Sequence, residues 1–511
     1  MSPLQGGIVM KRKEFERVTP ESVGIPSEAV AHLIDRLETS GVTEPHGLML
    51  MRFGKVFAEG WWAPYASGVR HGLQSHTKTY AATAVGIAYT EGILSLDERV
   101  IDIFPQHAPK EPSENLKKLT VRDVLCMGCG MDTMPAPTEH WIKDFLATPV
   151  THVPGTTYMY NSTGSTLLGA IVREKTGLGL HDYLKPRLFD KIGIDADNLR
   201  WMTMPDGMEV GGGGLLATTE DNLRLMKLYA DGGVWEGERI LSEEYVELAT
   251  SLQNQSASER AGNPFAEDNF VGYGFQMWMC RPNGVYRADG AMGQFTIVVP
   301  EREMILAITE FANGGTGSEM PQRVLDLFWE FLESLPPVDV RSLPENEAAA
   351  CALQHKMQCL ALPAPRASKL PADMHAVDGV RYRIKSGRLS FDGTEMARMM
   401  SGSKPAPTVE TITLRFAPDA CVLCFEQGGQ ASEIRIATDG TRCENRAQGL
   451  LCRLLCSGEW VSDHEFAVTM RWLEMASPKR LVFDFDGDSL HITSEQDGPF
   501  VPKLDVQAVR E

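Results

Sequence analysis

The strongest constraint on the fold is a change of pattern near Pro336-Pro337. Helical and strand-like segments are mixed before this point, whereas short strand-like segments separated by turn residues dominate after about residue 375. A chain of 511 residues also exceeds the size that one hydrophobic core usually serves. We therefore expect two domains, with an N-terminal extension over 1–20, a first domain over 21–335, a linker over 336–375 and a second domain over 376–511.

The first domain combines helical and strand patterns. SEAVAHLIDRLETSG (27–41) has helical periodicity, and HGLMLMRFGKVFAEGWW (46–62) is typical of two strands joined by a turn. The clearest helix prediction is the Ala-rich segment SHTKTYAATAVGIAYTEG (75–92). Three later strand segments precede a closing helix, PQRVLDLFWEFLESL (321–335). This order predicts an α+β domain in which the two ends complete one sheet.

The second domain shows strand patterns from VRYRIKSG (380–387) to SLHITSE (489–495). Strand-like segments at such short intervals predict an all-β domain, either a sandwich or a lipocalin-like barrel. We find no catalytic constellation in it. Two roles stay open, a lid or wall over an active site and a dimerisation surface, so a homo-oligomer is possible.

Charge and hydropathy restrict the partners. Lys and Arg number 49 against 68 Asp and Glu, a net charge of −19, and the basic residues are scattered. We therefore expect no nucleic-acid partner. Because no stretch approaches the roughly 18 apolar residues that a membrane span needs, we also expect no membrane and a cytoplasmic location.

The ten cysteines fit that compartment as reduced thiols. Cys421, Cys424, Cys452 and Cys456 could in principle supply four zinc ligands, but they lie in apolar runs without nearby His or Gly-rich knuckles. The pattern favours buried core cysteines, and we expect no metal or organic cofactor.

Ser75 and Lys78 carry the main chemical signal. They stand three residues apart at the start of the Ala-rich helix, so both side chains project from the same face of its first turn. A serine hydroxyl is a poor nucleophile until a base takes its proton, and a lysine can do this when its pKa is lowered. Free N–H groups at the helix N-terminus could hold an oxyanion. We therefore expect Ser75 to form an acyl-enzyme, with Lys78 as its base.

The same spacing occurs again in Ser401-Gly402-Ser403-Lys404. This copy lies in a Gly/Pro-rich turn, where nothing holds the two side chains together. Spacing alone is therefore a weak signal, and the helical context favours the first copy.

A second motif makes a family resemblance specific. VPGTTYMYNSTGSTLLGAIVREKTG (153–177) resembles the second box of the β-lactamase-related serine hydrolases, which include class C β-lactamases, D-Ala-D-Ala carboxypeptidases and family VIII esterases. The segments at 74–100, 119–131 and 211–233 resemble the same family, and the likeness runs from about residue 20 to 335. It implies a penicillin-binding-protein-like fold with an antiparallel sheet, flanking helices and a helical subdomain. The C-terminal domain matches only accessory β domains of some members.

The resemblance also implies roles for residues of the second box. Tyr160 carries over as a second general acid/base, with its phenolate favoured by nearby lysine charge and with protons passing between Ser75 and the leaving group. Asn161-Ser162 departs from the Tyr-x-Asn pattern of β-lactamases, because Ser162 stands where their amide would be. Asn161 and Ser162 are candidates for substrate binding, and Ser162 can orient Lys78 or a carbonyl with a shorter reach.

The third box departs further from the family pattern. Where β-lactamases and carboxypeptidases have Lys-Thr-Gly, this chain has Ala288-Asp289-Gly290. The missing cation recognises a substrate carboxylate, and Asp289 would repel one. Arg287 could replace it only through a one-residue slip of the strand, which would change its face. The N–H near Ala291 is the second oxyanion candidate, and Gln294 either binds substrate or ties the strand end.

The remaining aromatic and histidine residues are ambiguous. Trp61, Trp62, Trp278 and Tyr286 either wall a pocket or fill a core, with core favoured. His76 is interpreted as structural. The sequence therefore predicts a serine hydrolase of a small ester or amide. The alternatives are a D-amino-acid peptidase or amidase, a β-lactamase-like enzyme, and a penicillin-binding or sensing module that acylates without turnover.

Overall fold

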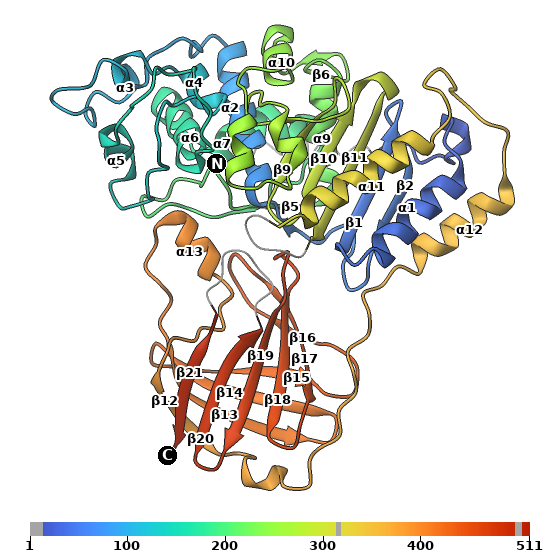
Figure 1. The fold of residues 1–511 in the computed structure, drawn as a ribbon, viewed down its shortest axis with the longest axis vertical. Helices are drawn as coiled ribbons and strands as arrows, with labels where there is room; N and C mark the ends of the chain where they lie inside the picture. The colour runs from blue at the N-terminus through green and yellow to red at the C-terminus, as the bar shows by residue number, and fades with distance from the viewer. Residues whose placement is uncertain (1–13, 313–317, 496–502) are drawn as a thin grey trace, which may run out of the picture.

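The computed structural model describes residues 14–312, 318–495 and 503–511, and these form two bodies (Figure 1). A helix-and-sheet body holds the earlier part of the chain and a β-barrel holds the later part. The expected α+β fold followed by an all-β domain is therefore confirmed. Most of the expected N-terminal extension, residues 1–13, lies outside the described residues.

The main sheet of the first body has six antiparallel strands in the order β2-β1-β11-β10-β9-β8. Strands β1 and β11 pair directly, so distant parts of the chain complete one sheet, as the order of the segments predicted. The strands are β1 Glu44–Arg52, β2 Lys55–Trp61, β8 Trp278–Met279, β9 Tyr286–Gly290, β10 Gln294–Val299 and β11 Met304–Phe311. Short strands β3 His71–Gly72, β5 Leu215–Ala217 and β4 Arg200–Trp201 form a second sheet, and β6 Val234–Trp235 pairs with β7 Glu238–Arg239.

Helices cover both faces of the main sheet. Along β1, Leu48 and Leu50 join a core shared with α1 and α11, whereas Met49 and Met51 join a core shared with α2, α6 and α9. Alternate side chains of a strand point to opposite faces, so β1 is apolar on both. The helices are α1 Ser27–Thr39, α2 Thr77–Thr90, α3 Val100–Ile103, α4 Val121–Leu125, α5 Trp141–Ala147, α6 Ser162–Thr176, α7 Leu180–Leu184, α8 Asp190–Ile192, α9 Thr219–Ala230, α10 Glu243–Ala249, α11 Met320–Ser334 and α12 Glu347–Gln358.

The second body is a barrel rather than a sandwich. Its sheet runs β15-β14-β13-β12-β21-β20-β19-β18-β17-β16, and β15 also pairs with β17, which closes the sheet on itself. A separate apolar core fills it. The strands are β12 Arg381–Ser386, β13 Val409–Ala417, β14 Ala420–Gln427, β15 Gln430–Ala437, β16 Cys443–Arg446, β17 Arg453–Trp460, β18 Glu465–Trp472, β19 Lys479–Asp486, β20 Ser489–Glu495 and β21 Asp505–Arg510, and helix α13 Glu395–Ser401 lies between β12 and β13.

The barrel contacts the first body beside strand β3. The Gly72 N–H donates to the Glu474 carbonyl oxygen at 2.8 Å. Arg471 on β18 donates to both carboxylate oxygens of Glu44, at 2.6 and 3.1 Å. A backbone contact at β3, shortly before Ser75, and a charged contact at the start of β1 therefore hold the two bodies together.

The segment expected as a linker is partly bound to the first body. Helix α12 packs on α1 and β2. The Arg52 guanidinium also donates to the carbonyl oxygens of Val338 and Val340, at 3.0 and 3.1 Å. Only the later part of residues 336–375 thus leads to the barrel.

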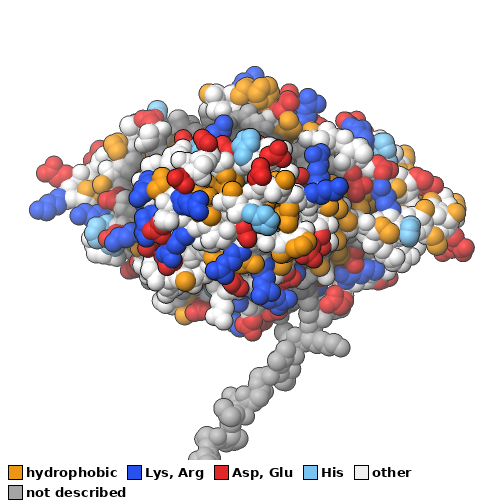
Figure 2. Space-filling view, turned by 90° about the horizontal axis from the view of Figure 1, so that it is seen from below, with side chains coloured by type: hydrophobic (Ala, Val, Ile, Leu, Met, Phe, Trp, Pro, Cys, Tyr) orange, Lys and Arg blue, Asp and Glu red, His pale blue; other side chains and the backbone are white. Residues whose placement is uncertain are grey.

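The surface shows no segregation of charge on the face in Figure 2, where acidic and basic side chains are interspersed. Among the described residues, none of the helices combines the length and apolar character that crossing a membrane requires.

Candidate active site

Ser75 lies in a tight turn that leads into α2. The turn Gln74–His76 is a 3-10 helix, and Gln74 has a φ of 51° in the left-handed region. Ser75 is partly exposed although its neighbours on both sides are buried. Such a turn costs backbone energy and holds the serine hydroxyl at an opening in an otherwise buried segment.

Lys78 is placed directly against this hydroxyl. Its Nζ donates to Ser75 Oγ at 2.8 Å and to the Gly212 carbonyl oxygen at 2.5 Å. The lysine is 1% exposed, and burial lowers its pKa to about 7, although the nearby Asp289 carboxylate acts to raise it. Near neutral pH a substantial fraction of Lys78 is therefore uncharged and able to accept a proton.

The Gly-rich segment 211–214 supplies the second partner of Lys78. The Gly212 N–H donates to Thr166 Oγ1 at 3.0 Å, which ties this segment to α6. A Cβ atom on Gly212 would lie 2.1 Å from the Ser162 carbonyl oxygen, so only glycine allows so close an approach. The sequence resemblance included this segment, but it did not indicate that a backbone carbonyl holds the lysine.

Tyr160 closes the cluster from the side of α6. Lys78 Nζ lies 4.8 Å from the centroid of its ring, and the ring stacks on Trp278 at 5.8 Å and 13°. Burial raises the pKa of Tyr160 above its ordinary value, although a hydrogen bond with Ser75 acts to lower it. This differs from the phenolate that the resemblance implied, because removal from water favours the neutral phenol. Tyr160 therefore keeps its proton near neutral pH and can act as a proton donor rather than as a base.

Asn161 and Ser162 have different surroundings. Asn161 is the N-cap of α6, and its Oδ1 accepts from the Gly164 N–H at 2.8 Å. Its side chain is fully buried and used in this cap, which argues against the predicted substrate contact. Ser162, the first residue of α6, is partly exposed beside Gly212 and stays a candidate for substrate binding.

The third box lies at the end of β9. Ala288 is buried in the core, and Arg287 and Asp289 form an ion pair with Nε to Oδ2 at 2.8 Å. Arg287 also donates to Asn269 and Cys280 and is fully buried. It therefore does not replace the missing cation of the box, because its guanidinium is already occupied. Asp289 is partly exposed and lies close enough to Lys78 to affect its pKa.

The turn after β9 approaches the Ser75 turn closely. A Cβ atom on Gly290 would lie 2.1 Å from the Leu73 carbonyl oxygen, so glycine is required here. Gln294 Nε2 donates to the carbonyl oxygens of Met292 and Glu310 at 3.0 and 2.7 Å. These hydrogen bonds tie the start of β10 to the preceding turn and to β11, so Gln294 has the structural one of its two predicted roles rather than substrate binding. This leaves Ala291 partly exposed at the tip of the turn, where its N–H stays the second oxyanion candidate.

The other predicted residues are mostly structural. His76 is buried and hydrogen bonds to Thr296 Oγ1 at 3.0 Å, and burial lowers its pKa to about 4. Trp62 and Tyr286 are core residues. Trp278 is also buried, yet its contact with Tyr160 places it in the site, which the sequence left open.

The second Ser-x-x-Lys copy shows no such arrangement. Ser401 Oγ bonds to the Arg398 carbonyl oxygen and to Ser403, and Lys404 is exposed. The ten cysteines are all free, and among the described residues no group of three or more His, Cys, Asp or Glu is arranged to hold a metal ion.

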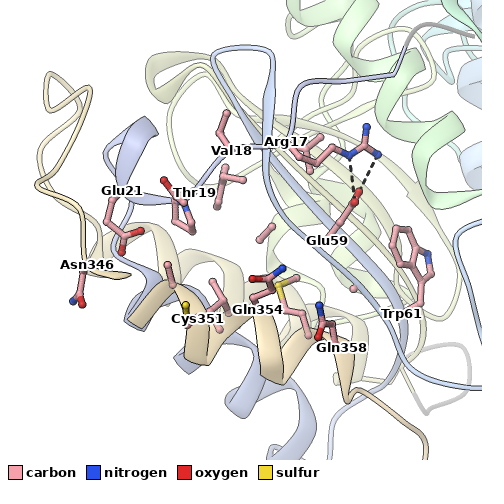
Figure 3. Close-up of a pocket in the computed structure, with 18 of the residues that line it drawn as sticks. Arg17, Val18, Thr19, Glu21, Glu59, Trp61, Asn346, Cys351, Gln354 and Gln358 are labelled. Atoms are coloured by element: carbon pink, nitrogen blue, oxygen red, sulfur yellow. Dashed lines mark hydrogen bonds and ion pairs between the residues drawn. The ribbon is translucent and has the colours of Figure 1, made fainter. Parts of the chain in front are cut away.

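A groove lies away from this cluster, between β2 and α12, with a volume of about 930 Å³ (Figure 3). Glu59, which pairs with Arg17, and Trp61 line it. None of the candidate catalytic residues lines this groove, so Trp61 belongs to a different surface.

An antiparallel sheet and a helical region that meet at a Ser-x-x-Lys turn, with a tyrosine opposite, define the class of penicillin-binding-protein-like hydrolases. A family model described as Beta-lactamase matches residues 30–325, more than half of the chain. The chain therefore belongs to the β-lactamase family, and the resemblance inferred from its motifs is confirmed.

Several known proteins are similar to this chain. The 6-aminohexanoate-dimer hydrolase of Paenarthrobacter ureafaciens is 26% identical over 313 residues, which cover 56% of this chain and 78% of that protein. Penicillin-binding protein 4 of Amycolatopsis lactamdurans is 28% identical over 337 residues, 55% of this chain and 85% of that protein. A solved structure from Bacillus anthracis, described as a 6-aminohexanoate-dimer hydrolase, matches with a TM-score of 0.50 and 17% identity over 64% of this chain and 89% of that chain. This last likeness shows the fold.

Proposed function

We propose that the protein is a serine hydrolase that works through a covalent acyl-enzyme. The observation that carries the proposal is the 2.8 Å contact between Lys78 Nζ and Ser75 Oγ, made by a buried amine whose pKa is lowered to about 7. A neutral amine at that distance can take the hydroxyl proton as the oxygen attacks a carbonyl.

In acylation, Ser75 Oγ bonds to the carbonyl carbon and its proton moves to Lys78 Nζ. The N–H groups of Ser75 and Ala291 stabilise the oxyanion. The bond to the leaving group then breaks, and the leaving group takes a proton from the Tyr160 hydroxyl, which Lys78 restores. In deacylation, water attacks the acyl carbon, and its proton passes through Lys78 back to Ser75 Oγ.

We propose a small ester or amide without a carboxylate beside the bond that breaks. Support comes from β9, where Ala288 faces the core and the Arg287 guanidinium is occupied by Asp289. A substrate carboxylate there would meet the partly exposed Asp289 without a compensating cation from this strand.

A second candidate function is hydrolysis of short amides, including D-amino-acid peptides and β-lactams. Two relatives favour it, because one is named a hydrolase of the 6-aminohexanoate dimer and the other a penicillin-binding protein. A p-nitrophenyl ester, a D-aminoacyl anilide and nitrocefin separate the candidates. We expect the ester to be the best substrate and nitrocefin, which carries a carboxylate, to be the poorest.

Replacing the candidate nucleophile tests the mechanism. We expect Ser75→Ala to abolish both ester turnover and labelling by a fluorophosphonate probe, because Ser75 Oγ carries the acyl group in the proposed mechanism. Ser401→Ala is the matched control, since Ser401 has the same spacing to a lysine without the contact, and it should behave as wild type. Undiminished labelling of Ser75→Ala would refute the assignment. A stable acyl adduct without product release would instead favour a binding or sensing module.

We also propose a cytoplasmic location, and a homo-oligomer stays a prediction from the sequence. All ten cysteines lack disulfide partners, which supports a reducing compartment.

A further inference from the structure

Helix α13 of the second body lies against the helical region of the first body (Figure 1). Glu395, its first residue, accepts a hydrogen bond from Lys479 on β19 at 3.0 Å, so the helix is fixed to the barrel. Two of its methionines, Met396 and Met400, contact segments that form the candidate active site.

The first contact is with the oxyanion turn. Met396 is 7% exposed and packs in a small cluster with Met292 and Phe311. Met292 directly follows Ala291, whose N–H is the proposed oxyanion donor. The start of α13 therefore supports one side of the Ser75 site.

The second contact is with the segment that holds Lys78. The Met400 methyl carbon lies 2.1 Å from the position that a Cβ on Gly213 would occupy. That position is also 3.8 Å from the Gln74 carbonyl oxygen, next to Ser75. Gly213 directly follows Gly212, which accepts the hydrogen bond from Lys78, so α13 contacts both the oxyanion turn and the Gly-rich segment that holds the lysine.

The third contact joins α13 to the loop before α5. A Cβ on Gly402 would lie 2.3 Å from the Pro137 carbonyl oxygen. The same loop carries Met134, whose sulfur lies 3.3 Å from the Ser162 backbone nitrogen. Met134, Met292, Met396 and Met400 therefore border the site, and Met399 lies about one turn along α13 from Met396. We name these five residues the methionine rim.

Two members of the methionine rim are unusually accessible. Met134 is 49% exposed and Met399 is 52% exposed. Large apolar side chains gathered at the border of a site mark a surface that binds apolar ligands. Methionine is unbranched and flexible, so it adapts to a chain that has no rigid shape.

We propose that the methionine rim binds a flexible, unbranched alkyl or acyl chain of the substrate, so that the second body sets the preference for chain length. This inference rests on the proposed hydrolase function and narrows its substrates to esters or amides with an apolar chain. The ion pair between Arg287 and Asp289 leaves β9 without a free cation, which agrees with an uncharged substrate.

The test compares kcat/KM for p-nitrophenyl octanoate and p-nitrophenyl acetate. Burial of each methylene improves binding about fourfold, so we expect the wild type to prefer octanoate. Met134→Gln and Met399→Gln should each lower the octanoate-to-acetate ratio about fivefold or more, because an amide placed against the chain must be desolvated. Both residues are exposed, so the variants should fold. Met357→Gln on α12, away from the site, is the matched control and should keep the wild-type ratio.

An unchanged octanoate-to-acetate ratio in both rim variants, whether kcat/KM for the two esters stays the same or falls equally, would overturn the proposal. Met399→Leu should keep the wild-type preference for octanoate, since leucine is apolar. The Ser75→Ala variant separates the two inferences. If Ser75→Ala hydrolyses neither p-nitrophenyl octanoate nor p-nitrophenyl acetate, while the rim variants keep the wild-type octanoate-to-acetate ratio, the hydrolase proposal stands. The methionine rim then has no role in selectivity.

Discussion

At the scale of single residues, Lys78 decides the chemistry. Burial favours its neutral form, whereas Asp289 favours the charged form, and burial is the larger effect because the pKa falls to about 7. Sequence spacing predicted that Lys78 could reach Ser75, but it could not show which of these two effects is larger. The answer depends on packing by segments more than a hundred residues away.

The pH profile tests this balance. Lys78 acts as a base only when it is unprotonated, so we expect kcat/KM for a neutral ester to rise with pH and to level off above a midpoint near 7. Asp289→Asn should move the midpoint to lower pH, because it removes the carboxylate that favours charged Lys78 and leaves the Arg287 cation unpaired nearby. Asp486→Asn on the barrel surface should leave the midpoint unchanged. A midpoint that moves upward in Asp289→Asn would contradict the account.

At the scale of elements, the sequence predicted which segments form helices and strands better than it predicted where they begin. The Ala-rich segment is a helix as expected, but α2 begins at Thr77 because Gln74–His76 forms a 3-10 turn with a left-handed residue. Local propensity does not indicate that turn. It depends on β9, whose Gly290 lies against the Leu73 carbonyl.

The candidate site could be predicted in part for the same reason. Ser75, Lys78 and Tyr160 come together as their motifs indicated. The carbonyl of Gly212 and the ring of Trp278 were missed as partners, because backbone groups and distant aromatics carry no motif of their own. The second motif makes Asn161 a candidate for substrate binding, but in the structure Asn161 caps α6, a role that Asn at a helix start commonly takes.

At the scale of the whole molecule, the contact between the two bodies includes a partly buried ion pair. Glu44 accepts from Arg471, and its pKa is lowered to about 2 by hydrogen bonds and charge from His46 and Arg471, which together outweigh its burial. The stability that this carboxylate contributes is therefore present above pH 4.5, the ordinary value of the group, and is lost as the pH falls toward 2.

Replacing the arginine should weaken the docking of the barrel. We expect Arg471→Leu to lower the free energy of unfolding by about 2 kcal/mol, less than for a fully buried pair because Glu44 is partly exposed. The loss should shrink below pH 4, where Glu44 loses its charge in the unfolded chain. Arg383→Leu, which breaks an exposed pair with Glu511 on the barrel, is the control and should cost well under 1 kcal/mol. Denaturant titrations at pH 7 and pH 3 measure the free energy of unfolding of both variants. If Arg471→Leu and Arg383→Leu lose the same free energy of unfolding, the Glu44–Arg471 pair does not stabilise the interface as we expect.

The most direct test of the account as a whole is the location of the acyl group during turnover. Acid quenching of the protein while it hydrolyses p-nitrophenyl octanoate, followed by peptide mass spectrometry, traps and locates the intermediate. We predict a mass increase equal to one octanoyl group on Ser75 and an unmodified peptide containing Ser401. An octanoyl group on another residue, or turnover that continues in Ser75→Ala, would contradict the central claim that Ser75 and Lys78 form the catalytic pair.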